Sequence, residues 1–176
     1  HIGYILIGLA SMNEAGIKGI VIYMFIYVIM NIAIFAIILS LKIDENYIEK
    51  ISDLSGLGKL KPAISFCIAI IMLSMAGIPP LAGFFGKFYI FIAAIDSGLY
   101  LLAILGVLSS VISAYYYLRI IKIMYFDEVN ISNVQINTSK KSISIIFVSI
   151  IFISLFIFYP SLLIDIGSNI SFNYFR

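Results

Sequence analysis

Long stretches without a charged side chain divide this sequence, and their lengths constrain its fold more than any other feature. A helix needs about 20 apolar residues to cross the hydrocarbon core of a bilayer. Lipid offers no hydrogen-bond partners, so a crossing segment must satisfy its backbone internally, as a helix does. The charge-free stretches and their apolar extensions predict four complete transmembrane helices, over residues 20–41, 63–95, 100–126 and 143–164.

The composition agrees with a lipid environment. The chain has 176 residues, of which 62% are hydrophobic and 11% charged, and its mean hydropathy is +1.13. Soluble domains are about a quarter charged, so a soluble fold is excluded. The net charge of +2 comes without a basic patch, so no nucleic-acid partner is expected. The single cysteine, Cys67, excludes a disulfide framework and an iron–sulfur cluster held by this chain alone.

The first apolar stretch, residues 2–12, is too short to cross a membrane. It is typical of the end of a helix that begins earlier, and we expect the N-terminal part of a longer protein to be missing. The fold class predicted is therefore an all-α integral membrane protein. Its architecture would be a polytopic helix bundle with four full transmembrane helices and an N-terminal helix stub.

The positive charges predict the orientation, because cytoplasmic loops of membrane proteins are enriched in Lys and Arg. Two loops, 42–62 and 127–142, should share one side of the membrane. That side holds most of the positive charge near the ends of the predicted helices, with Lys42, Lys50, Lys59, Lys61, Arg119, Lys122, Lys140 and Lys141. The opposite side holds Lys18 and Arg176. We expect both loops to be cytoplasmic and both chain ends to lie outside.

The second predicted helix should be broken. As a continuous helix, residues 63–95 would run about 50 Å at ~1.5 Å per residue, whereas the hydrocarbon core is only ~30 Å thick. Gly77, Pro79 and Pro80 lie in its middle. Proline donates no backbone hydrogen bond and clashes with the preceding turn. We predict that helical bonding is interrupted within 76–81, as in the discontinuous helices of many ion transporters.

Lys87 follows this break and allows two interpretations. It could end the span and extend into the lipid headgroups, but the apolar residues 88–95 would then lie in water or at the interface. Alternatively, Lys87 lies inside the protein. Burial disfavours the charged form of an amine, so an internal lysine can exchange protons at a pH where a surface lysine cannot.

Other polar residues in the spans have structural interpretations. Asn31 is expected to hydrogen-bond a neighbouring helix. Tyr115 to Tyr117, with Arg119, are typical of an aromatic belt at the membrane surface. Gly83 and Gly86 should allow close helix packing. The sequence carries no phosphate loop, dinucleotide fingerprint or metalloprotease motif, and His1 is its only histidine, so no cofactor or bond-making chemistry is expected in this chain.

Three segments carry a family resemblance: HIGY at 1–4, LSMAGIPPLAGFFGKFYIF at 73–91 and SAYYYLRIIKIMYF at 113–126. They resemble the C-terminal part of the subunit N family of bacterial NADH-quinone oxidoreductase (complex I), one of the proton-translocating antiporter-like subunits. The triplet Gly86-Lys87-Phe88 favours subunit N over the related subunits L and M. Mrp-type antiporter subunits are more distant relatives.

The resemblance implies a family fold of fourteen transmembrane helices with two inverted repeats, each containing one broken helix. Residues 1–176 would be the C-terminal part of a single antiporter-like transmembrane domain. Lys87 matches the lysine assigned to the outward half of the proton path. His1 matches a polar position near the central hydrophilic axis. The residues of the inward path would lie before residue 1.

On this resemblance, the chain is expected to be a non-redox, proton-translocating membrane subunit of a respiratory translocase in the bacterial inner membrane. Its partners would be the other membrane subunits of complex I. NADH, flavin, iron–sulfur clusters and quinone would bind in partner subunits. Two alternatives remain open at this point: a subunit of an Mrp-type sodium/proton antiporter, and a packing fragment that carries no ions.

Overall fold

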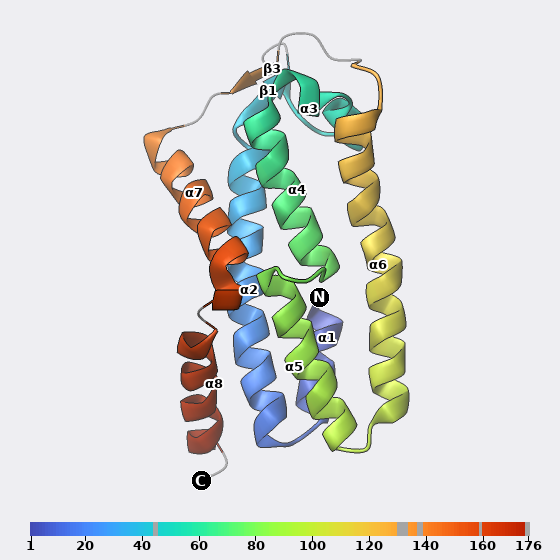
Figure 1. Cartoon of the computed structure of the whole chain (residues 1–176), viewed down its shortest axis with the longest axis vertical. Coiled ribbons are helices and arrows are strands. Elements are labelled where there is room, and N and C mark those ends of the chain that lie inside the picture. The colour runs from blue at the N-terminus through green and yellow to red at the C-terminus, as the bar shows by residue number, and fades with distance from the viewer. Residues whose placement is uncertain (44–45, 130–133, 137–138, 159, 175–176) are drawn as a thin grey trace.

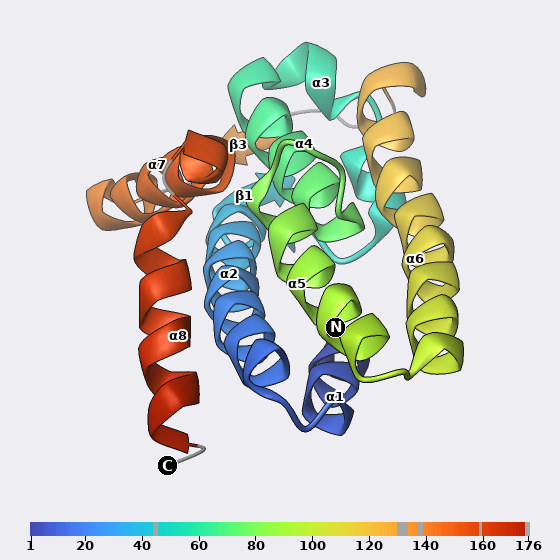
Figure 2. The same ribbon diagram turned by 60° about the horizontal axis from the view of Figure 1, so that its bottom comes forward.

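The computed structural model describes residues 1–43, 46–129, 134–136, 139–158 and 160–174. Its long helices lie side by side (Figures 1 and 2). The helices are α1 (Ile2–Ala10), α2 (Glu14–Ile38), α3 (Leu57–Leu60), α4 (Pro62–Ala76), α5 (Ala82–Asp96), α6 (Tyr100–Phe126), α7 (Lys140–Leu155) and α8 (Ser161–Tyr174), with 3-10 turns η1 (Ile51–Leu54) and η2 (Phe156–Phe158). The strands are β1 (Leu41–Ile43), β2 (Asn46–Tyr47) and β3 (Val134–Ile136).

Within the described residues, three helices are long and apolar enough to cross a membrane, at Glu14–Ile38, Tyr100–Phe126 and Lys140–Phe158. The predicted span at 100–126 is confirmed by α6, and the one at 20–41 by α2 except at its end, because α2 ends at Ile38 and Leu41 begins β1. Helix α2 begins earlier than predicted because the side chain of Asn13 caps it, accepting a hydrogen bond of 2.7 Å from the Gly16 amide.

The short first helix is also confirmed, but it changes the placement of the N-terminus. Helix α1 has nine residues, so at ~1.5 Å per residue it covers about half of a membrane. His1 consequently lies at mid-height in the bundle (Figure 1). The expectation that both chain ends lie at the outer surface is therefore wrong for His1. Arg176, counted for the outer side, lies outside the described residues.

The break in the predicted helix 63–95 is confirmed. Helix α4 ends at Ala76 and α5 begins at Ala82. Gly77 ends α4 in the left-handed conformation, with φ of 87° and ψ of 36°, and its amide bonds back to the carbonyls of Leu73 and Ser74. Glycine adopts this conformation without the cost that a Cβ would add. The two halves lie end to end at a slight angle (Figure 1).

The predicted span at 143–164 is present but displaced: the helix long enough to cross runs over Lys140–Phe158, and residues 161–164 belong to the separate helix α8. Helix α7 ends at Leu155, and α8 begins only at Ser161, after η2. Pro160 explains the interruption, because it has no amide to donate and its ring clashes with the preceding turn. Both α7 and α8 pack against α2. The bundle therefore contains a second discontinuous element besides the α4–α5 pair.

The two polar loops form a small sheet that the sequence did not predict. Strand order is β2-β1-β3, all antiparallel, with Lys42 opposite Tyr47 on one side and Gln135 on the other. The fold class expected from the sequence, all-α, is therefore incomplete, because it leaves out this sheet. These strands are two or three residues long, too short for an alternating pattern to reveal them. The sheet holds both loops at one end of the bundle (Figure 1).

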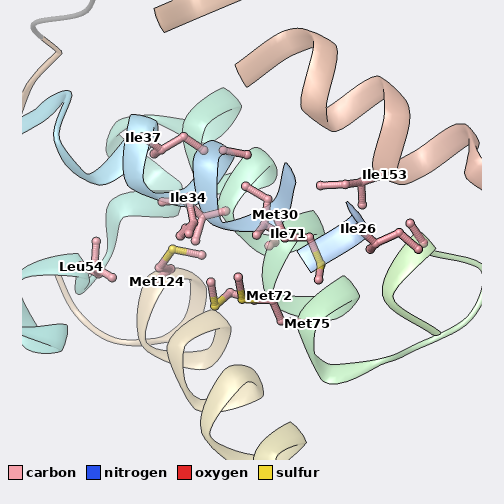
Figure 3. Close-up of a cluster of buried hydrophobic side chains, with 14 of the residues drawn as sticks. Ile26, Met30, Ile34, Ile37, Leu54, Ile71, Met72, Met75, Met124 and Ile153 are labelled. Carbon is pink, nitrogen blue, oxygen red and sulfur yellow. The ribbon is translucent and has the colours of Figure 1, made fainter. Parts of the chain in front are cut away.

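The main core lies where α2 meets α4, α6 and α7 (Figure 3). Its labelled members are Ile26, Met30, Ile34, Ile37, Leu54, Ile71, Met72, Met75, Met124 and Ile153. A second, smaller cluster contains Tyr23 of α2, and close approach between helices marks it: a Cβ added to Gly86 of α5 would lie 2.5 Å from Tyr23. Small residues allow this contact, as membrane helices use them.

Candidate functional site

Lys87 lies inside the bundle, not at a membrane surface. Only 4% of the residue is exposed, although it sits in the second turn of α5. Its side chain reaches back across the break to the end of α4. The interpretation that places Lys87 among lipid headgroups is therefore wrong.

The prolines determine what Lys87 binds. In an α-helix the carbonyl of residue i accepts from the amide of residue i+4. The partners of the Met75 and Ala76 carbonyls would be residues 79 and 80, and both are prolines without an N–H. Lys87 Nζ donates to these same two carbonyl oxygens, at 3.0 and 3.1 Å. The ammonium thus replaces the hydrogen bonds that the double proline removed.

A third hydrogen bond completes the site. Lys87 Nζ donates to Ser110 Oγ of α6 at 2.9 Å. A lysine ammonium has three donors, so all three are used. The ring of Tyr4 in α1 lies on another side, with its centroid 5.0 Å from Nζ, within range of a cation–π contact. Sequence reasoning missed Ser110; the available signal was a serine pair, Ser109-Ser110, inside an apolar span.

Electrostatics and space both favour a cation here. The last carbonyls of α4 carry the partial negative charge of a helix C-terminus, which stabilises a nearby cation. Gly77 leaves room for the lysine: an added Cβ would lie 3.1 Å from Lys87 Cδ and 3.3 Å from Nζ. The left-handed conformation therefore favours glycine at position 77, and a side chain there would also have to displace the lysine by a few tenths of an ångström.

The two half-helices are fixed to each other beside this site. The Gly83 amide at the start of α5 donates to Ser74 Oγ near the end of α4, at 3.0 Å. An added Cβ at Gly83 would lie 1.9 Å from the Ser74 carbonyl oxygen. Position 83 therefore admits only glycine, and the expectation of close packing there is confirmed.

His1 forms a second polar group at the same height. Its Nδ1 is 2.5 Å from Tyr23 OH, its Nε2 is 2.7 Å from Tyr117 OH, and its ring stacks on Tyr27 at 4.9 Å. A phenol can donate or accept, so both neutral tautomers and the charged imidazolium find partners here. The group can therefore take or release a proton at either ring nitrogen.

Two residues have different roles from those predicted. Tyr117 was expected at the membrane surface with its neighbours, but its hydroxyl lies in the bundle beside His1. Asn31 was expected to bond another helix, but its side chain donates to the Tyr27 carbonyl of its own helix, at 2.8 Å. Local sequence could not separate the inward tyrosine from Tyr115, which is exposed.

Tyr4 lies between the two polar groups. Its ring contacts Lys87 Nζ on one side and the His1 ring, edge to face at 6.2 Å, on the other. A cavity of about 310 Å³ adjoins Lys87 and Ser110. Another, of about 410 Å³, adjoins His1, Tyr4 and Ser109. In the described part of the chain, no three His, Cys, Asp or Glu side chains gather in a way that could hold a metal ion.

A helical bundle with one helix interrupted at mid-height and a buried lysine beside the interruption defines a class of fold: helical membrane proteins with discontinuous helices. A family model described as "NADH:quinone oxidoreductase/Mrp antiporter, TM" matches residues 1–113. The chain belongs to this family. The resemblance seen in the sequence is confirmed.

Within the family, the chain is similar to subunit N of NADH-quinone oxidoreductases. It is 47% identical to that of Pelagibacter ubique, over 97% of this chain and 36% of the relative. It is 58% identical to that of Paramagnetospirillum magneticum, over 73% of this chain and 26% of the relative. The chain spans about a third of the length of the curated relatives it matches.

Solved structures agree on the fold. The Mrp complex from Dietzia sp. DQ12-45-1b matches with a TM-score of 0.81 at 20% identity, over 98% of this chain and 40% of that chain. Respiratory complex I from Thermus thermophilus with bound NADH matches with a TM-score of 0.79 at 22% identity, over 97% of this chain and 37% of that chain. At these identities the matches show a shared helical membrane fold.

Proposed function

We propose that this chain forms part of a proton-translocating membrane subunit of a bacterial NADH:quinone oxidoreductase. The observation that carries the proposal is the buried Lys87 amine, bonded across a broken helix at mid-bundle height. Ionisable side chains at such depth are costly and are functional candidates for that reason. Subunit N relatives at 44–58% identity support the assignment to this enzyme.

The geometry suggests how proton exchange would act on the helix break. The charged amine donates three hydrogen bonds, to Met75, Ala76 and Ser110. The neutral amine has only two N–H donors. Loss of a proton therefore changes the hydrogen bonds of the site: the two remaining N–H groups can serve the two carbonyls, and the Ser110 hydroxyl must then turn to donate to the lone pair of the amine. Protonation of Lys87 and the contact between α5 and α6 would be coupled in this way.

His1 would be the other proton-carrying group. It can hold a proton between Tyr23 and Tyr117, and Tyr4 separates it from Lys87. Water or a movement of Tyr4 would complete the connection. Residues 1–176 would then be the C-terminal part of one antiporter-like domain, with further proton-carrying residues elsewhere in the whole protein.

The enzyme assignment has consequences outside this chain. NADH, flavin, iron–sulfur clusters and quinone would bind in partner subunits, and this chain would be a non-redox part of the translocase. Its partners would be neighbouring membrane subunits in the bacterial inner membrane. The Lys-rich loops 42–62 and 127–142 would face the cytoplasm.

A second candidate is a subunit of an Mrp-type sodium/proton antiporter. The family description covers both, and the Mrp complex from Dietzia shares the fold. The two functions differ in a measurable way: only the first couples proton movement to quinone reduction. The subunit N relatives favour the first.

Replacing Lys87 tests the proposal. In the full-length subunit of the intact complex, Lys87→Ala should strongly reduce proton pumping and slow the coupled oxidoreductase rate. Arginine should restore pumping poorly, because it stays charged at all relevant pH. The measurement is pumping in proteoliposomes, with assembly followed on native gels, since two carbonyls lose their partner at about 1–3 kcal/mol each.

Lys59→Ala is the matched control, because Lys59 is exposed at the sheet end of the bundle. It should pump normally. Normal stoichiometry and rate in Lys87→Ala would refute the proposed role of the lysine.

A further inference from the structure

Three oxygen atoms around Lys87 Nζ come from two separate elements. Met75 and Ala76 contribute backbone carbonyls from the end of α4, and Ser110 contributes a hydroxyl from α6. All three lie within 2.9–3.1 Å of the nitrogen. Unwound backbone carbonyls at half-helix ends are the ligands with which membrane transporters coordinate small cations.

These oxygens do not owe their arrangement to the lysine. Pro79 and Pro80 deprive the two carbonyls of helical partners whatever residue stands at position 87. The Gly83–Ser74 hydrogen bond holds α4 against α5. Ser110 sits inside the continuous helix α6, so its position is set by that helix. We therefore expect the three oxygens to stay close together in a variant without Lys87.

The cavity beside Lys87 reaches two of the three residues that supply these oxygens, Ala76 and Ser110. It has a volume of about 310 Å³ and is lined by Ala76, Gly77, Lys87 and Ser110 on its polar side. Its other lining residues are apolar, and no carboxylate is among the described residues that line it. Divalent ions are bound in proteins mainly by carboxylates, so neutral oxygens at a helix C-terminus favour a single positive charge.

We propose that the carbonyls of Met75 and Ala76 and the hydroxyl of Ser110 form a binding site for one monovalent cation of the ammonium or alkali-metal class. In the native protein the ammonium of Lys87 occupies this site. The lysine is thus a tethered cation that keeps free cations out, and the ion exchanged here is limited to the proton. This inference rests on the proposed function and names the ion selectivity of the same site.

The proposal is tested by replacing Lys87, so that no side-chain ammonium occupies the site. In the intact complex, Lys87→Ala opens the site, and ammonium chloride should raise its thermal unfolding temperature with saturation, because a ligand that binds only the folded state stabilises it. Wild-type complex should show no such saturating shift. Choline chloride at equal ionic strength controls for salt. Thermal unfolding is the readout because ammonia collapses pH gradients in pumping assays. Sodium and potassium chloride are tested in the same way to rank the cations.

Two double variants locate the site. Adding Ser110→Ala to Lys87→Ala should weaken the ammonium effect several-fold, since one of three ligands is lost. Adding Ser113→Ala should not, because Ser113 lies one turn away on the same helix and bonds only its own helix. Equal weakening by both serine variants would show an unspecific effect and overturn the proposal.

The outcomes separate the two hypotheses. No saturable stabilisation in Lys87→Ala, together with lost pumping, would refute the cation site and leave the proton-carrying role of Lys87 intact. Normal pumping in Lys87→Ala would refute the proposed function whatever the thermal result. If Lys87→Ala does not assemble, Lys87→Ser, whose short side chain does not extend to the position of Nζ, is measured instead by the same criteria.

Discussion

A lysine or a proline inside a membrane helix is destabilising by itself. Here the effects of Lys87, Pro79 and Pro80 compensate one another. Each proline removes the helical partner of one carbonyl, and the lysine donates to both of these carbonyls. The free-energy cost of burying the ammonium is offset, because all three of its donors form hydrogen bonds and it lies beside a helix C-terminus. A substitution at any one of the three positions therefore affects the other two.

The tyrosines beside His1 should matter through their hydroxyl groups. Tyr23→Phe and Tyr117→Phe each leave one ring nitrogen of His1 without its partner. We expect proton pumping to slow about fivefold in each, corresponding to about 1 kcal/mol for one lost hydrogen bond. Tyr27→Phe is the control. Tyr27 contacts His1 through its stacked ring, and phenylalanine keeps this ring. Unchanged pumping in both variants would contradict a proton-carrying role for His1.

The two discontinuous elements of the bundle have different local causes but meet in space. The first break follows from Gly77 and two prolines, and the second from Pro160. Phe85, early in α5, lies 5.5 Å from Phe156 of η2, measured between ring centroids. Phe156 is buried, with 3% exposed. The start of α5 is therefore packed directly against the turn that interrupts the last span.

Gly83 is the position where the first break tolerates least change. Gly83→Ala should destabilise the subunit by about 1–3 kcal/mol or more, because the added methyl overlaps the Ser74 carbonyl. Thermal unfolding of the purified complex measures the effect. Gly3→Ala is the control, since no atom lies within 4 Å of a Cβ there. A Gly83→Ala complex as stable as the control would show that the half-helices can separate without cost.

The molecule as a whole has one polar end and one end of tight turns. The sheet joins the loops after α2 and after α6 at the same end, together with η1 and α3 (Figure 1). Their shared position agrees with the Lys and Arg distribution, which assigned both loops to one side of the membrane. Turns between α1 and α2 and between α5 and α6 lie at the other end.

Accessibility labelling tests which end is cytoplasmic. Single cysteines at Ser52 and Ser139, both exposed, should react with a membrane-impermeant maleimide from the cytoplasmic face, in a background where Cys67 is replaced. Ser55 is unsuitable, because only 6% of it is exposed. Asp96→Cys, exposed at the opposite end, should react from the outside. Labelling in the reverse sense would overturn the orientation.

Local sequence was sufficient for the elements that depend on neighbours in the chain. Charge-free length predicted α2 and α6, and Gly77 with its prolines predicted the break, because a missing amide has the same effect in any surroundings. The same rule applied to Pro160 would have predicted the second break. Composition predicted a lipid environment, and three motifs indicated the family before any fold was known.

The site itself required the tertiary structure. Ser110 is 23 residues from Lys87 in the chain, and Tyr117 is 116 residues from His1. In apolar spans a single hydroxyl carries no local signal of its partner, and Tyr115 and Tyr117 differ only in the direction in which the helix presents them. The amino-acid sequence by itself determined where α2 and α6 run and where the helix at 63–95 must break. The packing of α1, α4, α5 and α6 decided that the broken end would hold a cation, because hydrogen bonds between helices depend on proximity in space.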